Sequence, residues 1–160
     1  MNEKVLQFLS YLRKDSRLKL TEISKQTGVL ISTLFDMLKE LQNNIITKST
    51  VIVDFQKLGY HTKAQIFLRV RSKDKSPLVN YLSEQNCVNS IYKTNNGWDL
   101  ILETVHRNLR DLDKFVDGIP EKYDVENHQI HYLIEDLKKE QFLAEFDNIN
   151  GSIIKETKSR

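Results

Sequence analysis

Small hydroxyl side chains stand where two short helices are expected to begin, in a pattern that suits contact with a nucleic acid. Thr21 opens the first of these helices, and Ser32 and Thr33 open the second. Hydroxyl groups at helix starts suit hydrogen bonds to phosphates and to base edges in the major groove, which admits one α-helix. Phe35, further along the second helix, suits either contact with a thymine methyl group or packing in the core, and the pattern leaves both open.

The second helix is acidic in its middle. The charged residues of segment 31–41 are Asp36, Lys39 and Glu40. Lys39 is therefore the only basic residue that this segment offers to DNA, and the net charge of the segment is −1. A negative helix loses the counterion release that drives most DNA affinity, and three explanations stay open. In the first, Asp36 or Glu40 accepts a hydrogen bond from cytosine N4. In the second, the chain binds DNA weakly and acts through a partner subunit. In the third, basic residues outside this helix contact the DNA backbone. The candidates for backbone contact are Arg13, Lys14, Arg17, Lys19, Lys25 and Lys48.

Catalytic and metal-binding groups are sparse in this sequence. We expect the four histidines, His61, His106, His128 and His131, to be exposed or satisfied by hydrogen bonds. His128 and His131 are three residues apart on an expected strand, so they face opposite sides and cannot chelate one metal ion. Cys87 has no basic neighbour in the sequence, which indicates an inert thiol. The sequence therefore predicts no enzyme activity, no metal and no cofactor.

Three short helices must position the hydroxyl and charged residues. Apolar residues at helical spacing predict helices near residues 5–12, 21–27 and 31–42. Gly28 ends the second helix because glycine accepts a positive φ without steric cost. Leu30, at the cap of the third helix, cannot accept a hydrogen bond from its first turn. The β-prone segments 45–47 and 51–53 predict either a small wing or one long bent strand.

The second half of the chain alternates between strand and helix periodicity. The predicted order is strand, helix, strand, strand, helix, strand, which is the ferredoxin-like pattern. The strands are expected near 64–70, 88–93, 100–105 and 123–134, and the helices begin near Ser76-Pro77 and at Asn108. Asn95-Asn96-Gly97 predicts a hairpin turn, and a last helix is expected at about 135–147.

Both faces of the expected sheet carry apolar side chains. Ile66, Leu68, Val70, Leu100 and Leu102 fall on one face, and Phe67, Ile101 and Val105 on the other. Two helices can cover only one face. A large exposed apolar patch is unusual in a monomer, so the pattern predicts a dimer that buries the second face.

Composition excludes several classes of protein. The 160 residues contain one cysteine and carry a net charge of +2, which excludes a disulfide framework and a polybasic tail. Residues 1–60 hold nine basic and six acidic residues, whereas residues 61–160 hold fifteen and sixteen, so a polyanion is expected to meet the first module. No signal-like start and no long apolar run is present, so we expect a cytoplasmic protein with no membrane contact.

The order and spacing of several short motifs resemble the Lrp/AsnC (feast/famine) family of transcriptional regulators. The resemblance covers about residues 5–146. The matching segments are Leu12-Arg13-Lys14-Asp15-Ser16-Arg17, Glu22-Ile23-Ser24-Lys25-Gln26-Thr27-Gly28-Val29, Ser32-Thr33-Leu34, Ile45-Ile46, Val53-Asp54, Lys57-Leu58-Gly59 and Gly97-Trp98-Asp99-Leu100. The family implies an α+β chain with an N-terminal winged helix-turn-helix and a C-terminal ferredoxin-like βαββαβ (RAM) effector domain. The expected boundaries are 1–54 for DNA binding, 55–61 for the linker, 62–147 for the effector domain and 148–160 for a loose tail.

The resemblance also implies a function. It implies a homodimer, with tetramers or octamers above it, that binds a palindromic double-stranded operator and responds to an amino acid. The implied effector residues are Asn95, Asn96, Gly97 and Asp99. An aspartate suits the α-amino group of an amino acid and turn amides suit its α-carboxylate, although a plain hairpin with Asp99 as its cap fits equally well.

Two other functions stay open beside a regulator. A helper subunit that forms mixed oligomers with a paralogue needs no basic recognition helix. A sirohaem decarboxylase has the same two-module architecture, but its arginine-rich turn is absent from Val53-Asp54-Phe55-Gln56-Lys57-Leu58-Gly59.

Overall fold

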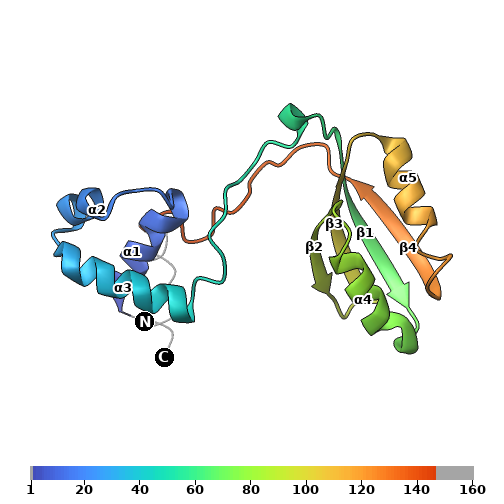
Figure 1. The fold of residues 1–160 in the computed structure, drawn as a ribbon, viewed down its shortest axis with the longest axis horizontal. Helices are drawn as coiled ribbons and strands as arrows, with labels where there is room; N and C mark the ends of the chain where they lie inside the picture. The colour runs from blue at the N-terminus through green and yellow to red at the C-terminus, as the bar shows by residue number, and fades with distance from the viewer. Residues whose placement is uncertain (1, 147–160) are drawn as a thin grey trace, which may run out of the picture. The chain divides into compact units, whose positions relative to one another are not determined.

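The computed structural model describes residues 2–146 and divides into two compact units (Figure 1). One unit combines the residues up to Val51 with those from Leu137 onward, and the other is Ile52–Asp136. The second unit ends at Asp136, whereas the effector domain expected from the sequence runs over residues 62–147. The expected tail, 148–160, lies outside the described residues.

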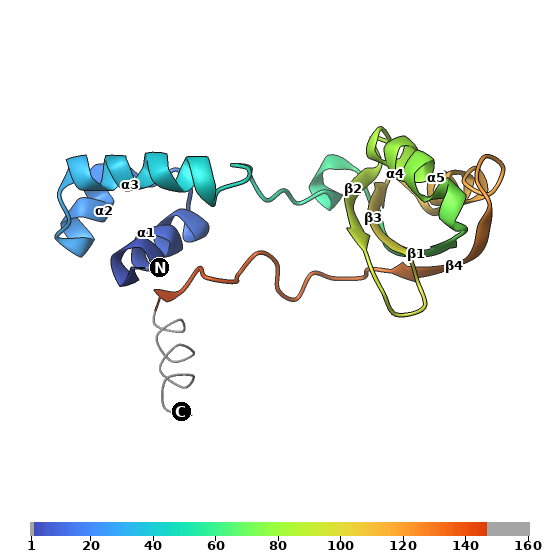
Figure 2. The same cartoon turned by 90° about the horizontal axis from the view of Figure 1, so that it is seen from below.

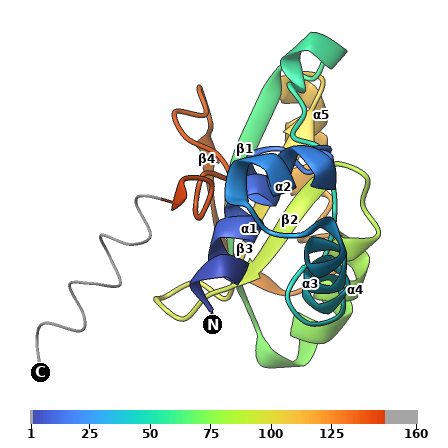
Figure 3. The same cartoon turned by 90° about the vertical axis from the view of Figure 1, so that its left-hand side faces the viewer.

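Three helices make the first unit, as the sequence predicts. They are α1 (Glu3–Lys14), α2 (Leu20–Thr27) and α3 (Ile31–Asn44). Figure 3 looks onto this unit from the side of α2 and α3. The helices bury one side chain cluster, which consists of Phe8, Leu9, Ile23, Leu34 and Leu41. Each of these side chains falls on the apolar stripe of its helix, so burial of the stripes is what brings the three helices together.

The prediction of a wing is wrong. Residues 46–54 contain no strand and no helix. The side chains of Val51 and Ile52 are 59% and 61% exposed. A β-prone segment becomes a strand only where a neighbouring strand takes up its backbone hydrogen bonds, and the first unit contains no strand in the described residues. The short 3₁₀ helix η1 (Gln56–Leu58) follows and ends at Gly59, whose φ is 85°.

A four-stranded antiparallel sheet and two helices make the second unit. The strands are β1 (Thr62–Val70), β2 (Val88–Lys93), β3 (Leu100–His106) and β4 (Val125–Tyr132), in the order β2-β3-β1-β4. The short 3₁₀ helix η2 (Ser72–Asp74) leads into α4 (Lys75–Ser83), and α5 (Leu109–Asp117) joins β3 to β4. Figure 2 shows α4 and α5 on the same face of the sheet. This is the predicted ferredoxin-like arrangement.

The two faces of the sheet separate as the alternation predicts. Ile66 of β1 pairs in register with Leu102 of β3, and both are fully buried under the helices. Phe67 pairs with Ile101 on the opposite face, where both remain only half-buried. His128 and His131 pair with Leu68 and Gln65 respectively, so they do lie on opposite faces.

Two expectations about helices are wrong, one about where a helix begins and one about whether a helix forms. Helix α4 begins at Lys75 after the cap residue Asp74, two residues before the expected cap Ser76 and first helical residue Pro77. The expected helix at 135–147 is absent over residues 133–145. Its apolar stripe does not form because Leu143 packs against the core of the first unit instead. Within residues 2–146 no helix combines the length and the apolar character that a membrane crossing needs.

Candidate functional site

The turn between α2 and α3 is fixed by hydroxyl groups. Gly28 has a φ of 70°, and its N–H donates to the Ser24 carbonyl at 2.9 Å. The Ser24 hydroxyl donates to the Val29 carbonyl at 2.6 Å, and the Thr27 hydroxyl donates to the Ile23 carbonyl at 2.8 Å. The Ser24–Val29 bond ties the turn to the end of α2. The sequence motif marked Ser24 and Thr27 as part of a resemblance, but not this role.

Helix α3 presents the predicted contact residues to solvent. Ser32, Thr33, Phe35, Asp36 and Lys39 are exposed. Their neighbours Leu34 and Leu41 are buried, so the helix has one inner and one outer face. Phe35 is 49% exposed and is therefore not a core residue. Of the two alternatives for this side chain, contact with a thymine methyl group stays a prediction.

The cap and the charge of α3 agree with the sequence. Leu30 gives no side-chain cap, as expected, and is 72% exposed. The ammonium of Lys39 lies 4.6 Å from the centre of the Phe35 ring, which is the geometry of a cation–π contact. The one base of this helix is therefore held against its aromatic neighbour rather than extended freely.

The candidate bases around the helices have different surroundings. Thr21 on α2 and the side chains of Lys14, Arg17, Lys19, Lys25 and Lys48 are exposed. Arg13, in contrast, already has partners within the chain. Its guanidinium donates to the Phe142 carbonyl at 3.1 Å and forms a salt bridge of 3.0 Å with Glu140. No sequence pattern connects Arg13 with a residue so far along the chain.

The hairpin between β2 and β3 carries the predicted effector residues. Asn95, Asn96 and Gly97 are exposed, and Gly97 has a φ of 81°. The Gly97 carbonyl accepts a hydrogen bond of 2.7 Å from the guanidinium of Arg69. This bond fixes the turn to β1. Arg69 is one of the residues that the sequence did not single out.

Asp99 already uses both of its carboxylate oxygens. One oxygen accepts a hydrogen bond of 2.8 Å from the Val70 backbone N–H, and the other lies 2.7 Å from the ammonium of Lys75. Chiefly through the hydrogen bond from Lys75, and then through the Val70 N–H, the pKa of the Asp99 carboxyl lies below its ordinary value. These contacts tie Asp99 to β1 and to α4, and neither of them caps the turn of residues 95–97. An effector ammonium would have to share this carboxylate with Lys75.

A cavity of about 710 Å³ lies beside this pair, between α4 and β2. Its apolar wall includes Val79 and Ile91, and its polar groups include Asn80, Lys93 and the Asp99–Lys75 pair. Charges of both signs therefore meet next to an apolar surface. That combination suits a small zwitterion with an apolar side chain.

One expectation about the histidines is wrong. His106 is buried at 5% exposure, and its Nε2 atom has no hydrogen-bond partner. Burial lowers the pKa of His106 below its ordinary value, against a smaller opposing effect of Asp111. The ring packs against Phe115 at 5.6 Å between centres. Burial likewise raises the pKa of the Cys87 thiol, which agrees with an inert group. Residues 2–146 contain no group of three or more side chains that could hold a metal ion.

Two curated relatives of this chain are transcriptional regulators. The HTH-type transcriptional regulator FL11 of Pyrococcus furiosus is 30% identical over 69% of this chain and 74% of its own length. An uncharacterised HTH-type transcriptional regulator of Pyrococcus horikoshii is 28% identical over 86% and 93%. No family model matches the chain.

Two solved structures share the fold at low sequence identity. A transcriptional regulator of Neisseria meningitidis, solved as a complex with L-methionine, superposes with a TM-score of 0.80 at 16% identity over 87% of this chain and 93% of its own. AsnC of Escherichia coli gives a TM-score of 0.77 at 20% identity over 87% and 95%.

Proposed function

This chain belongs to the Lrp/AsnC family of helix-turn-helix transcriptional regulators, and from that premise we propose that it is an operator-binding regulator that responds to an amino acid. The observation that carries the DNA-binding part is the outward face of α3, where Ser32, Thr33 and Asp36 stand exposed on a helix anchored by a buried inner face. Phosphate contacts are supplied by the exposed bases Lys14, Arg17 and Lys48.

The DNA-binding part is tested by selection from a random pool of duplexes. We expect one sequence class to be enriched and to resist competition by random DNA, with affinity falling as salt rises. Thr33→Ala combined with Lys39→Ala removes two groups from the outer face and should weaken specific binding about tenfold. The matched control is Lys114→Ala on α5, which should change affinity little.

The oligomeric size of both variants is compared with that of the unaltered chain. An unchanged size with weaker binding supports the contact role of α3. A changed size assigns α3 a structural role. No enrichment of any sequence by the unaltered chain would overturn operator binding and leave the helper-subunit alternative.

The effector part rests on the cavity beside the Asp99–Lys75 pair. A free amino acid is a zwitterion, and this cavity brings a carboxylate and the ammonium of Lys93 next to Val79 and Ile91. The turn 95–97 lies at the end of β2, close in sequence to both charges. Calorimetric titration with each proteinogenic amino acid should find one that binds. Lys93→Ala should weaken that binding about tenfold, while Lys114→Ala should not. Equal binding by both variants would remove the cavity from the site.

The oligomer part rests on the uncovered face of the sheet. Phe67, Ile101 and Val105 lie there half-buried, and Tyr92 is 53% exposed. A second copy that packs the same face against this one buries all four in a two-fold arrangement, which also matches a palindromic operator. Replacement of Ile101 by Lys should shift the chain from dimer to monomer in sedimentation, and an unchanged mass would contradict this interface.

A further inference from the structure

A segment from the far end of the chain is part of the helix-turn-helix unit. We define the C-terminal strap as residues 137–143. Its Leu143 packs against the core of the first unit, beside the buried cluster of α1, α2 and α3. Glu140 and Leu143 have φ values of 52° and 63°, a left-handed backbone that side chains other than glycine rarely adopt. Local preference therefore does not hold the strap in this path, and its tertiary contacts must.

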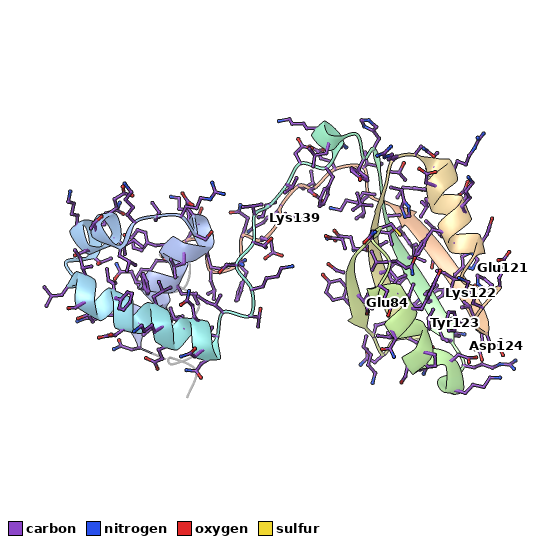
Figure 4. All side chains as sticks on the ribbon, viewed as in Figure 1. Glu84, Glu121, Lys122, Tyr123, Asp124 and Lys139 are labelled. Atoms are coloured by element: carbon purple, nitrogen blue, oxygen red, sulfur yellow. The ribbon has the colours of Figure 1, made fainter. Side chains whose placement is uncertain are left out.

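The main polar contact of the strap is with Arg13. The guanidinium donates from Nε to the Phe142 carbonyl at 3.1 Å and from Nη2 to the Glu140 carbonyl at 2.9 Å. Nη2 also donates to the Glu140 carboxylate at 3.0 Å, and the Arg13 side chain remains 34% exposed. Figure 4 labels Lys139, the residue that precedes Glu140. The Arg13 guanidinium thus binds two backbone carbonyl groups and one carboxylate of the strap.

Arg13 also stands at a place where DNA contact is expected. It lies in the last turn of α1 beside the exposed Lys14, and the connection from α1 to α2 carries two more exposed bases, Arg17 and Lys19. In a three-helix DNA-binding domain the connection between the first two helices contacts the phosphate backbone. Guanidinium groups bind phosphate with the same planar geometry with which they bind carboxylate. A phosphate and Glu140 are therefore alternative partners for one group.

The other end of the strap is tied to the sheet of the second unit. Asp136, the residue before the strap, accepts hydrogen bonds of 2.6 and 2.9 Å from the Lys63 ammonium. The Leu133 N–H donates to the Lys63 carbonyl at 2.8 Å, which fixes the chain after β4 to β1. The residues that lead into the strap are thus held by a strand of the unit that contains the effector cavity.

We propose that the C-terminal strap is an intramolecular competitor of DNA, in which Glu140 occupies Arg13 until a backbone phosphate displaces it. The proposal rests on the DNA binding proposed above. Because linkage is reciprocal, any state of the second unit that loosens the strap strengthens DNA binding, and DNA binding favours that state. The competition concerns a backbone contact, so it acts on every DNA sequence alike.

The test is a double-mutant cycle of Glu140→Gln and Arg13→Ala in the full chain. Binding to a labelled 30-base-pair duplex of arbitrary sequence is measured over a series of salt concentrations, because phosphate contacts need no operator. Glu140→Gln should tighten binding by up to about fivefold, since an exposed ion pair opposes the exchange only weakly. Arg13→Ala should reduce the slope of log K against log salt by about 0.9, the value of one phosphate contact. The effect of Glu140→Gln should vanish in the Arg13→Ala background.

The control is Glu121→Gln, which removes the same charge from an exposed position between α5 and β4. It should leave affinity and salt slope unchanged. If Glu140→Gln still tightens DNA binding in the Arg13→Ala background, the effect comes from the lost negative charge and not from competition for Arg13. That result would overturn the proposal. No tightening, or an unchanged slope in Arg13→Ala, would also overturn it. Failure of the unaltered chain to bind any duplex would instead refute the proposed DNA binding, and the competition with it. Melting curves of all variants establish that they are folded.

Discussion

The two units use their charged side chains in opposite ways. In the second unit Lys63 pairs with Glu103 and Asp136, and Lys75 pairs with Asp99. In residues 2–51 Arg13 is the one base that forms a salt bridge to any described residue. Four bases of the second unit, Lys57, Lys63, Arg71 and Lys75, thus form salt bridges within that unit, whereas most bases in residues 2–51 of the first unit are exposed without one.

This difference is better explained by position than by stability. The Lys63–Asp136 and Lys75–Asp99 pairs are partly exposed, and such salt bridges contribute little to folding, so these two pairs do not explain how the sheet holds together. They occur where loops meet strands: Lys75 and Asp99 fix the hairpin, and Lys63 and Asp136 fix the chain after β4. Exposed bases in the first unit keep their charge available for phosphates, whose counterions leave on binding. Salt bridges position loops in the second unit, whereas the exposed bases of the first unit are available to bind phosphate.

The largest expected effect separates the two cores. Leu34→Ala in α3 and Leu102→Ala in β3 each remove a fully buried side chain, and each should destabilise its own unit by about 2–5 kcal/mol. Trp98, the only tryptophan of the chain, lies in the second unit and reports on that unit alone. In urea, Leu102→Ala should shift the fluorescence transition to lower concentration. Leu34→Ala should shift only the helical circular dichroism.

The control for this pair is Leu30→Ala, which truncates a leucine that is 72% exposed. It should move neither transition. A fluorescence shift in Leu34→Ala as large as that in Leu102→Ala would show that the two units unfold as one.

The next effect tests the positioning role of charge in the second unit. Asp99→Asn removes the charge that holds both Lys75 and the Val70 N–H, and it should cost about 1–2 kcal/mol. The folded pKa of Asp99 is lowered, so its contribution is complete above the unfolded value and is lost as pH falls from about 3.8 toward the folded value. Urea unfolding at pH 7 and pH 3 measures both.

Asp113→Asn on the exposed face of α5 serves as the comparison, with no expected change. If Asp99→Asn were as stable as the unaltered chain at pH 7, the pair would not position the hairpin.

Sequence pattern predicted the second unit better than the first because its alternation of apolar and polar residues and its helix cap are local features of the chain. Alternation placed Ile66 and Phe67 on opposite faces, and Asn108 caps α5 as expected. Both features depend on residues adjacent in the chain. The wing over 45–53 failed because β-propensity carries no information about whether a partner strand exists.

The strap shows the same limit at longer range. Phe142, Leu143 and Phe146 have the spacing of a helix stripe, but Phe142 is held by Arg13, which lies 129 residues away in the chain. The occupied carboxylate of Asp99 was also beyond prediction, since its partners Val70 and Lys75 come from other elements. Residue types indicated the candidate site. The partners of those residues come from distant segments, and no local sequence pattern predicts them.

A smaller effect concerns the buried imidazole of the second unit. His106→Leu removes a polar atom that lacks a partner, so it should stabilise the fold by about 1 kcal/mol at neutral pH. The folded pKa of His106 is lowered, so the unfolded chain takes up the proton first and stability falls as pH drops below about 6.5. His106→Leu should remove that loss, as measured by melting between pH 8 and pH 5. His61→Leu, at an exposed position, should leave it in place, and an equal pH dependence in both would contradict this assignment.

The smallest effects compare one glycine from each unit. Gly28 and Gly97 both have positive φ, which asparagine tolerates better than most side chains. An added Cβ at Gly28 meets nothing within 4 Å, whereas at Gly97 it lies 3.3 Å from the Arg69 guanidinium. Gly28→Asn should therefore cost less than about 0.5 kcal/mol, and Gly97→Asn should cost more because Arg69 must move from the turn. If the costs in urea unfolding are equal, Arg69 yields freely, and the hairpin is no more tightly positioned than the turn between α2 and α3.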